Sequence, residues 1–555
     1  MAHRPPIPTL DPLLLAVVRG ALQEIASEMD AAFYSTAFSP IISEGRDIAS
    51  GLFHPLTGEV IAQGEESLPL FVTIMQQTVQ HVLRHVGEPG KFQPGDIYIV
   101  NDPYYGGTHL PDVKMVMPVF LDGDLLCFLA NTGHWPDVGG AAPGSFPGRA
   151  TEIYQEGLMI TPIRLYRAGE LDADVLQLIL RNIRVPEPRR GDILGQVSAL
   201  NVGAARMVAL SERYSRETLD AVIAEIFLRS ESAMRSYIRE LPDGVYHHVD
   251  YMDSDGINET PLKIALRMTV RGDTLTLDFT GSAPPCKGPF NAALGTTVSA
   301  CHVALKHLFL DVPINAGAFA PVEIIVPGDC FLNARHPKPV SGATAEVSQR
   351  LIDTVMGAFA QVLPEQVTAG CFSSTVNVTI GGDDPLKGPY VMYLYFGGGY
   401  GAHAQGDGIS NGCSLHSTAR MTPAEIYEQD FPFRVRHFRL REGSAGRGRY
   451  RGGFGVDLEL ELLRGEALLS MIGDRGVLPP AGRFGGEDAQ GTALRIKRRD
   501  GTQYSPPYVT KDERVPLSAG DIVQVLSPGG AGYGPPAERD PALRRQDERR
   551  GYFPG

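Results

Sequence analysis

The residues best suited to do chemistry stand in two short motifs of one pattern. His109-Leu110-Pro111-Asp112-Val113 recurs as His134-Trp135-Pro136-Asp137-Val138, at a spacing of 25 residues. Imidazole and carboxylate groups together form the ligand set of a divalent metal such as zinc or manganese. One such motif would be weak evidence, because its His can pack in a core and its Asp can cap a turn. The duplication favours a metal or catalytic site.

Short elements must position these motifs. Each motif follows an apolar run typical of a strand, residues 96–100 before the first and 125–130 before the second. The proline inside each motif argues against a helix interior, so both motifs are predicted on loops that leave strands and converge. Glycine pairs adjoin them, Gly106-Gly107 before the first and Gly139-Gly140 after the second. These pairs would let the backbone approach a substrate phosphate or oxyanion.

The rest of the chain mixes helical and strand patterns. Apolar residues at helical spacing predict helices over 11–39, 70–86, 175–183, 200–240, 296–310 and 350–363. Alternating runs predict a hairpin over 48–53 and 59–62, and strands over 247–252, 262–270 and 274–279. The fold class predicted is α+β, multi-domain with mixed sheets and with helices mainly in the N-terminal half. The predicted domains are 1–240 with the motif loops, a mixed 241–430, a β-rich 431–537 with glycine turns, and a charged tail, 538–555.

Composition narrows the class of protein. A chain of 555 residues is expected to fold as two or three domains. No apolar run reaches ~18 residues, so no membrane helix is predicted, and residues 1–8 lack the apolar region of a secretory signal. Six scattered cysteines favour the cytoplasm. The net charge of -14 argues against nucleic-acid binding. The 63 glycines and 43 prolines predict many tight turns and close backbone approaches.

Several other segments have two interpretations. The glycine-rich runs 397–403, 449–455 and 527–534 are compatible with anion binding by backbone amides, or with turns between strands. No lysine and serine or threonine complete a phosphate loop there. Glu44-Gly45-Arg46-Asp47 is interpreted as a structural ion pair. His302 and His307 are interpreted as core or interface residues, because a five-residue interval does not place them on one helix face.

Longer runs around the two motifs resemble a known family. Residues 94–112 and 133–145 are similar to characteristic stretches of the hydantoinase B/oxoprolinase family, and the likeness continues through 313–317, 337–340, 447–453 and 527–530. Members of this family are subunits of ATP-dependent enzymes that open hydantoin, oxoproline or lactam rings. Related subunits serve acetone and acetophenone carboxylases. The resemblance implies that ATP is bound by a separate A-type subunit or domain, which phosphorylates the carbonyl oxygen of the substrate.

The resemblance implies a metal site and a partner. A His-x-x-Asp and a downstream His bind the metal in the acetone carboxylase relatives, which corresponds here to His109, Asp112 and His134. We therefore expect a cytoplasmic B-type subunit of a hetero-oligomeric cyclic amide hydrolase, which uses manganese or zinc while its A-type partner uses ATP. The alternatives are a carboxylase subunit and a non-catalytic structural partner.

Roles are also expected for residues next to the proposed ligands. Asp137 or Asp102 would orient a ligand from outside or act as a base. The chain departs from many relatives at two positions, with Phe71 where they carry His and with Trp135 where ring-opening members carry a second His. Trp135 is expected to line an apolar substrate pocket.

Overall fold

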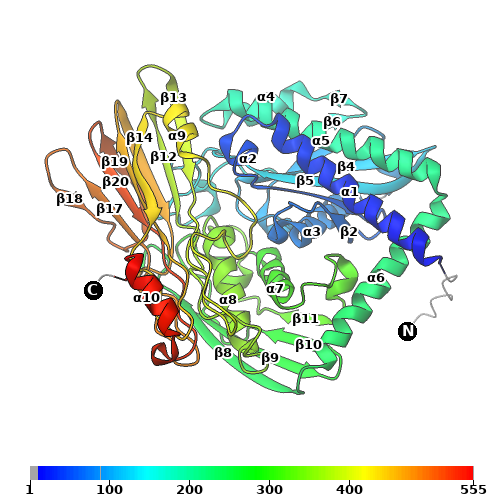
Figure 1. The fold of residues 1–555 in the computed structure, drawn as a ribbon. Coiled ribbons are helices and arrows are strands. Elements are labelled where there is room, and N and C mark those ends of the chain that lie inside the picture. The colour runs from blue at the N-terminus through cyan, green and yellow to red at the C-terminus, as the bar shows by residue number, and fades with distance from the viewer. Residues whose placement is uncertain (1–9, 88, 554–555) are drawn as a thin grey trace.

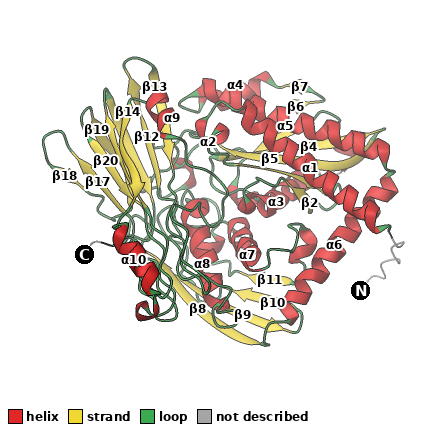
Figure 2. Cartoon of the chain, in the orientation of Figure 1, coloured by secondary structure: helices red, strands yellow, loops and turns green. Residues whose placement is uncertain are grey.

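The computed structural model describes residues 10–87 and 89–553, which form four sheets with helices packed between and around them (Figures 1 and 2). Residues 1–8, whose composition predicts no secretory signal, lie outside the described part of the chain. The predicted mixed α and β class is confirmed, and the long helices lie mostly in the N-terminal half (Figure 2).

The N-terminal part is built on one seven-stranded sheet with the order β2-β1-β5-β4-β3-β6-β7. Its strands are β1 (Ile48–Phe53), β2 (Val60–Gln63), β3 (Ile97–Val100), β4 (Asp112–Leu121), β5 (Asp124–His134), β6 (Ile163–Arg167) and β7 (Glu170–Leu171). Helices α1 (Pro12–Thr36) and α5 (Pro186–Arg213) cover one face and α3 (Pro69–Val86) covers the other (Figure 1). The short α2 (Pro40–Ser43) and α4 (Ala173–Arg181) flank it.

Helix α1 shows how the sequence pattern produces this packing. The Asp11 carboxylate accepts the amide of Leu13 at the helix start, and Pro12 occupies the first turn, where its missing N–H costs nothing. The apolar residues at helical spacing form the buried face, which includes Leu15, Leu22 and Phe33. The helix predicted over 11–39 is thereby confirmed.

The helix predicted over 200–240 is wrong in one respect, because two helices occupy this region. α5 ends at Arg213, and α6 (Arg216–Arg239) begins after Ser215, whose hydroxyl accepts the amide of Thr218. By length and composition alone, α5 is also long and apolar enough to cross a membrane. Its contacts with α1 and with strands β4 and β5 are those of a core helix.

The middle part adds a second sheet, with the order β11-β10-β9-β8. Its strands are β8 (Gly244–Met252), β9 (Leu262–Arg271), β10 (Thr274–Asp278) and β11 (Val322–Ile325). Helices α7 (Leu294–Leu308) and α8 (Ser348–Phe359) lie between the sheets: α7 packs on α3, and α8 packs on β8 (Figure 1). A π-helical turn, Ala343–Val347, leads into α8.

The C-terminal part contains two further sheets, with the orders β13-β12-β16-β19 and β14-β15-β20-β17-β18. They comprise β12 (Asn377–Asp384), β13 (Gly388–Leu394), β14 (Phe433–Leu440), β15 (Val456–Leu462), β16 (Glu466–Ile472), β17 (Ala493–Lys497), β18 (Gln503–Tyr504), β19 (Lys511–Ser518) and β20 (Ile522–Leu526), with α9 (Ala424–Asp430) beside them. β12 pairs with β16, so one sheet contains strands from both sides of residue 431.

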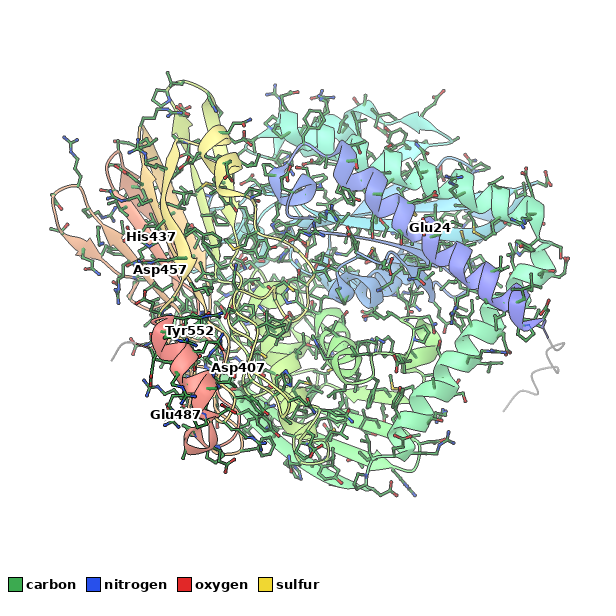
Figure 3. The ribbon with its side chains drawn as sticks, viewed as in Figure 1. Glu24, Asp407, His437, Asp457, Glu487 and Tyr552 are labelled. Carbon is green, nitrogen blue, oxygen red and sulfur yellow. The ribbon has the colours of Figure 1, made fainter. Side chains whose placement is uncertain are left out.

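The tail beyond residue 538 folds back onto this module. It forms a charged helix, α10 (Pro541–Arg549). Asp547 pairs with Arg539 at 2.8 Å and with Arg451 at 3.3 Å, and Arg539 in turn holds Asp407 at 2.8 Å. Figure 3 shows Asp407 and Tyr552 beside α10, with the His437–Asp457 pair of β14 and β15 above them in the view.

The three glycine-rich segments are structural. They run beside one another and exchange backbone hydrogen bonds: Gly399 N donates to Pro528 O, Gly453 N to Tyr400 O and Gly530 N to Gly453 O, each at 2.9 or 3.0 Å. A Cβ on Gly399 would lie 2.1 Å from Gly453 O, so the segments approach more closely than any side chain allows. Their amides bind one another, which favours the structural interpretation over anion binding.

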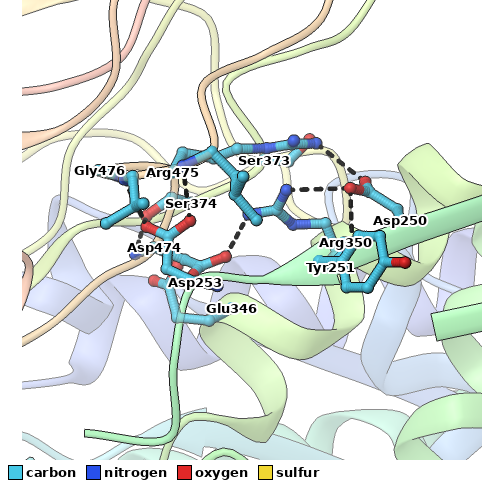
Figure 4. A network of polar contacts seen from close by, with 12 residues as sticks. Asp250, Tyr251, Asp253, Glu346, Arg350, Ser373, Ser374, Asp474, Arg475 and Gly476 are labelled. Carbon is cyan, nitrogen blue, oxygen red and sulfur yellow. Dashed lines mark hydrogen bonds and ion pairs between the residues drawn. The ribbon is translucent and has the colours of Figure 1, made fainter. Parts of the chain in front are cut away.

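A buried charge network joins the middle part to the C-terminal module (Figure 4). Arg350 of α8 pairs with Asp474, which Lys511 of β19 also contacts at 2.9 Å. Arg475 binds Asp250 of β8 at 3.3 Å. The burial of Asp474 would raise its pKa, but Lys511 and Arg350 outweigh it and lower the pKa to about 2. Because removing one member would leave a buried charge unpaired, the network fixes how these parts meet.

Candidate metal centre

Three adjacent strands bring the acidic and imidazole groups into one row. β4 and β5 form an antiparallel hairpin in which Asp112 and His134 are direct partners. β1 pairs with the other edge of β5, and the amide of His134 donates to the carbonyl of Asp47, which immediately precedes β1. The first motif therefore leads into a strand rather than leaving one, and the prediction of two loops leaving strands is wrong for it. The two motifs converge because the antiparallel register of β4 and β5 places Asp112 opposite His134.

His109, Asp112 and His134 form a buried cluster in which one candidate ligand atom from each lies within 4.8 Å of the others. The Nδ1 atom of His109 is 3.1 Å from Asp112 Oδ2, and the Nδ1 atom of His134 is 3.2 Å from Asp112 Oδ1. The two imidazoles meet edge to face with ring centroids 5.1 Å apart. Phe146 and Tyr393 pack against them and exclude bulk water.

A second layer of polar groups fixes the Asp112 carboxylate. Thr108 Oγ1 donates to Asp112 Oδ2 at 2.5 Å, and the buried Lys114 Nζ donates to Thr108 Oγ1 at 3.2 Å and to Asp112 O at 3.1 Å. Groups of this kind orient metal ligands and tune their basicity. The sequence pattern assigned no role to Lys114 or to Thr108, although both residues directly flank the first motif.

Burial sets the protonation states of the cluster. It lowers the pKa of His109 to about 3 and that of Lys114 to about 8. Burial alone would raise the pKa of Asp112, but His109 and His134 outweigh it and lower that pKa to about 2. At neutral pH the cluster thus presents an ionised carboxylate beside a neutral His109 imidazole, which is the form that binds metals.

The donor atoms fit a divalent ion. His134 Nε2 and Asp47 Oδ1 are buried and have no hydrogen-bond partner among the described residues, and the buried His109 Nδ1 has only its ion-pair contact with Asp112. Such atoms are costly to bury unless something else satisfies them. Asp47, His109 and Asp112 line a cavity of about 20 Å³, which is room for about one water. Two imidazoles and carboxylate oxygens suit zinc or manganese.

Asp47 is the site residue that the sequence analysis misassigned. From the sequence, the run Glu44-Gly45-Arg46-Asp47 was interpreted as a structural ion pair. In the structure Arg46 pairs with Glu66, and Asp47 lines the cavity. Burial raises the pKa of Asp47 to about 7, with His134 and Asp112 nearby. Phe71, one of the two departures from the family pattern, also lies in the cavity wall. The position of an acidic residue directly before the first predicted strand is the sequence feature that could have indicated Asp47 as a site residue.

Asp137 does not face the cluster. Its carboxylate accepts the amides of Gly139, Gly144 and Arg184 at 2.9–3.1 Å and pairs with the Arg184 guanidinium at 2.8 Å. The predicted hydrogen bond to a ligand imidazole is therefore not made, because the loop after β5 uses both oxygens. The two motifs are not equivalent: the first Asp belongs to the cluster and the second holds a loop.

We expect Asp137→Asn to lower stability by about 2 kcal/mol while the chain keeps its full metal content. The amide would retain some hydrogen bonds but lose the charge opposite Arg184, whose own partial exposure limits the cost. Thermal unfolding and elemental analysis of the purified variant measure both effects. Loss of the ion in this variant would show that Asp137 supports the metal after all.

The other predicted residues lie away from the cavity wall. Asp102 caps a short 3₁₀ turn by accepting the amide of Tyr104 at 3.0 Å, and burial raises its pKa. Trp135 is fully buried and donates from Nε1 to Gln196 of α5 at 3.1 Å, and it does not line the cavity beside the cluster.

The glycine pairs serve packing and turns. A Cβ on Gly106 would lie 2.5 Å from the amide nitrogen of Thr78 on α3, which only glycine permits. The carbonyls of Gly139 and Gly140 accept hydrogen bonds from the Arg184 guanidinium at 2.9 and 2.6 Å. Neither pair lines the cavity beside the cluster.

Comparison with known proteins places this arrangement in a family. The family model for hydantoinase B/oxoprolinase matches residues 11–536, and the chain belongs to that family. It is 31% identical over 561 residues to the B-type subunit of a putative D-/L-hydantoinase from Pseudomonas sp. (strain NS671), covering 98% of this chain and 93% of the relative.

Solved structures share the fold. The crystal structure of ATP-dependent caprolactamase from Pseudomonas jessenii superposes with a TM-score of 0.91 at 28% identity, covering 98% of this chain and 95% of the other. A nucleotide-free acetone carboxylase also gives a TM-score of 0.91, at 19% identity, covering 98% of this chain and 78% of the other. At that identity the second likeness concerns the fold alone.

Proposed function

We propose that this chain is the metal-dependent B-type subunit of an ATP-dependent cyclic amide hydrolase. It would act in the cytoplasm, in a hetero-oligomer, on a hydantoin, 5-oxoproline or lactam ring that an A-type partner has phosphorylated. The observation that carries the proposal is the buried His109–Asp112–His134 cluster, of which His109 and Asp112 line a small polar cavity. The hydantoinase and caprolactamase likenesses over nearly the whole chain support it.

The chemistry follows from the difficulty of amide hydrolysis. Phosphorylation of the carbonyl oxygen makes the ring carbon electrophilic, so water can add to it. An ion held by His109, Asp112 and His134 would supply the positive charge that makes water acidic at neutral pH. The Lys114–Thr108 pair holds the Asp112 carboxylate in place, and Phe146 packs over the imidazoles and keeps bulk water out.

A carboxylase subunit is the second candidate, favoured by the shared fold of acetone carboxylase. In that case the same site would stabilise an enolate formed from a phosphorylated ketone. The two functions are distinguished by presenting the reconstituted complex with hydantoin, 5-oxoproline and lactams, and in parallel with ketones and bicarbonate. Ring opening that depends on ATP supports the hydrolase, and carboxylation of a ketone without ring opening contradicts it.

Alone, the chain is expected to hydrolyse no ATP, because its glycine-rich segments bind one another and form no phosphate loop. Turnover should appear when the A-type partner is added. A coupled ADP assay on the purified chain, before and after addition of the partner, measures this. Robust ATP hydrolysis by the chain without a partner would refute the division of labour between two subunits.

A further inference from the structure

One imidazole in the wall of the cluster's cavity has no assigned role. His416 comes from a loop far along the chain and lines the same cavity as Asp47, His109 and Asp112. It is 5% exposed. It does not belong to the close His109–Asp112–His134 group. The molecule thus places a further buried base next to the candidate metal centre, outside the ligand set.

The tautomer of His416 is set by a chain of hydrogen bonds. Ser348 Oγ donates its only proton to the carbonyl of Thr344, in the π-helical turn before α8. The Ser348 oxygen, 3.2 Å from His416 Nδ1, must therefore accept from that nitrogen. Nδ1 then carries the proton of the neutral ring, and Nε2 keeps its lone pair. Burial lowers the pKa of His416 to about 4, which keeps the ring neutral.

The loop that carries His416 is held firmly. The His416 carbonyl accepts the amide of Leu70 at the start of α3, at 3.3 Å. Its neighbour Leu415 donates its amide to Gln349 Oε1 at 3.2 Å, and its carbonyl lies 2.7 Å from His307 Nε2. Fixed geometry of this kind is what proton transfer in a transition state requires.

The surrounding wall is suited to a polar occupant. Thr344, Tyr395 and Ser414 line the cavity, and their hydroxyl oxygens are buried without a partner among the described residues. Buried hydroxyls of this kind call for a ligand or water that can hydrogen-bond. The cavity has room for about one water. A water there would share this cavity with His416, Asp47, His109 and Asp112.

We propose that His416 is the catalytic base that takes a proton from the attacking water. The inference rests on the proposed function, with an O-phosphorylated cyclic amide as the substrate. His416 Nε2 accepts one proton as the water oxygen forms a bond to the ring carbon, and the C=N electron pair moves onto nitrogen. The imidazolium then returns that proton to the nitrogen. The net step adds water across the C=N bond. The hydroxyl proton of this adduct then moves to the ring nitrogen as the C–N bond breaks, which frees the amine and leaves an open-chain acyl phosphate. Hydrolysis of the acyl phosphate by a second water gives the carboxylate and inorganic phosphate.

The test uses the complete complex of this chain with its A-type partner, on a cyclic amide that the wild type opens. We expect His416→Gln to lower the rate of ring opening by about 10²–10⁴-fold, because glutamine has no basic lone pair. Metal content should equal that of the wild type. Phosphorus NMR should show the phosphorylated amide accumulating, because its formation by the partner does not need His416.

Two further variants separate the chemical role from a structural one. His416→Gly should regain activity when imidazole is added, which a purely structural role would not allow. His302→Gln is the control: His302 is partly buried in α7, where it stacks on Phe319 outside the cavity, and this variant should open the ring within about threefold of the wild-type rate.

Two outcomes would overturn the inference in distinguishable ways. If the wild-type complex opens no cyclic amide, the proposed function and the inference fail together. If the wild type is active and His416→Gln stays within about threefold of it, or loses its metal along with its activity, only the role of His416 as the base is overturned.

Discussion

Substitution of one cluster residue, His109→Ala or Asp112→Asn, is expected to remove the metal. Wild-type protein should carry roughly one divalent ion per chain, and either variant should bind it more than about 100-fold more weakly, because loss of a direct ligand exceeds loss of a residue that only orients one. One donor atom from each of the three residues lies within 4.8 Å of the others, so each residue can contribute a bond to the same ion. Elemental analysis by plasma mass spectrometry measures the ion.

The control for this prediction is His302, a partly buried histidine outside the cluster. His302→Ala should leave the metal content unchanged, since His302 stacks on Phe319 with ring centroids 3.8 Å apart and lies in α7. Far-UV circular dichroism should show that all three variants keep the fold, because His109 and Asp112 lie at one end of a sheet whose other contacts are unaffected. Full occupancy in both cluster variants would exclude these residues as the site.

The sequence could predict the cluster because its ligands recur in one local pattern. His109 and Asp112 lie three residues apart, and the second motif supplies His134 after a strand. Register explains why they meet, since β4 and β5 are joined by a tight turn and pair Asp112 with His134. Local strands and helices followed from apolar periodicity in the same way, as α1 and β1 show.

The sequence could not predict the contributions that arrive from far along the chain. Asp47 and His416 carry no motif, and only the pairing of β1 with β5 and the loop after β13 bring them to the cavity. The repeated motif also predicted site roles for two residues that follow His134. Asp137 instead binds the backbone of the next loop, and Trp135 donates to Gln196 of α5. A motif fixes residue types and spacing, whereas side-chain direction depends on partners that it does not contain.

The glycine-rich segments show the same limit in a different setting. Their composition predicted close approaches, but which backbones approach is a property of the assembled module. Gly452 lies against Gly530, so closely that a Cβ on Gly452 would be 1.7 Å from the Gly530 carbonyl oxygen and 2.2 Å from its carbon. Its own amide donates to Gly446 at 3.0 Å. Neither neighbour has a flexible side chain that could move aside.

Gly452→Ala is therefore expected to lower the free energy of unfolding by about 3 kcal/mol or more, the upper range for overpacking a core. The added methyl must push one backbone segment away and break the backbone hydrogen bonds that join the three glycine-rich segments. Gly20→Ala is the matched control: Gly20 lies in α1 with open space around its would-be Cβ, so alanine should stabilise by up to about 1 kcal/mol. Thermal unfolding of both variants measures the difference. Equal, small shifts would mean that the segments tolerate side chains and that the glycines serve another purpose.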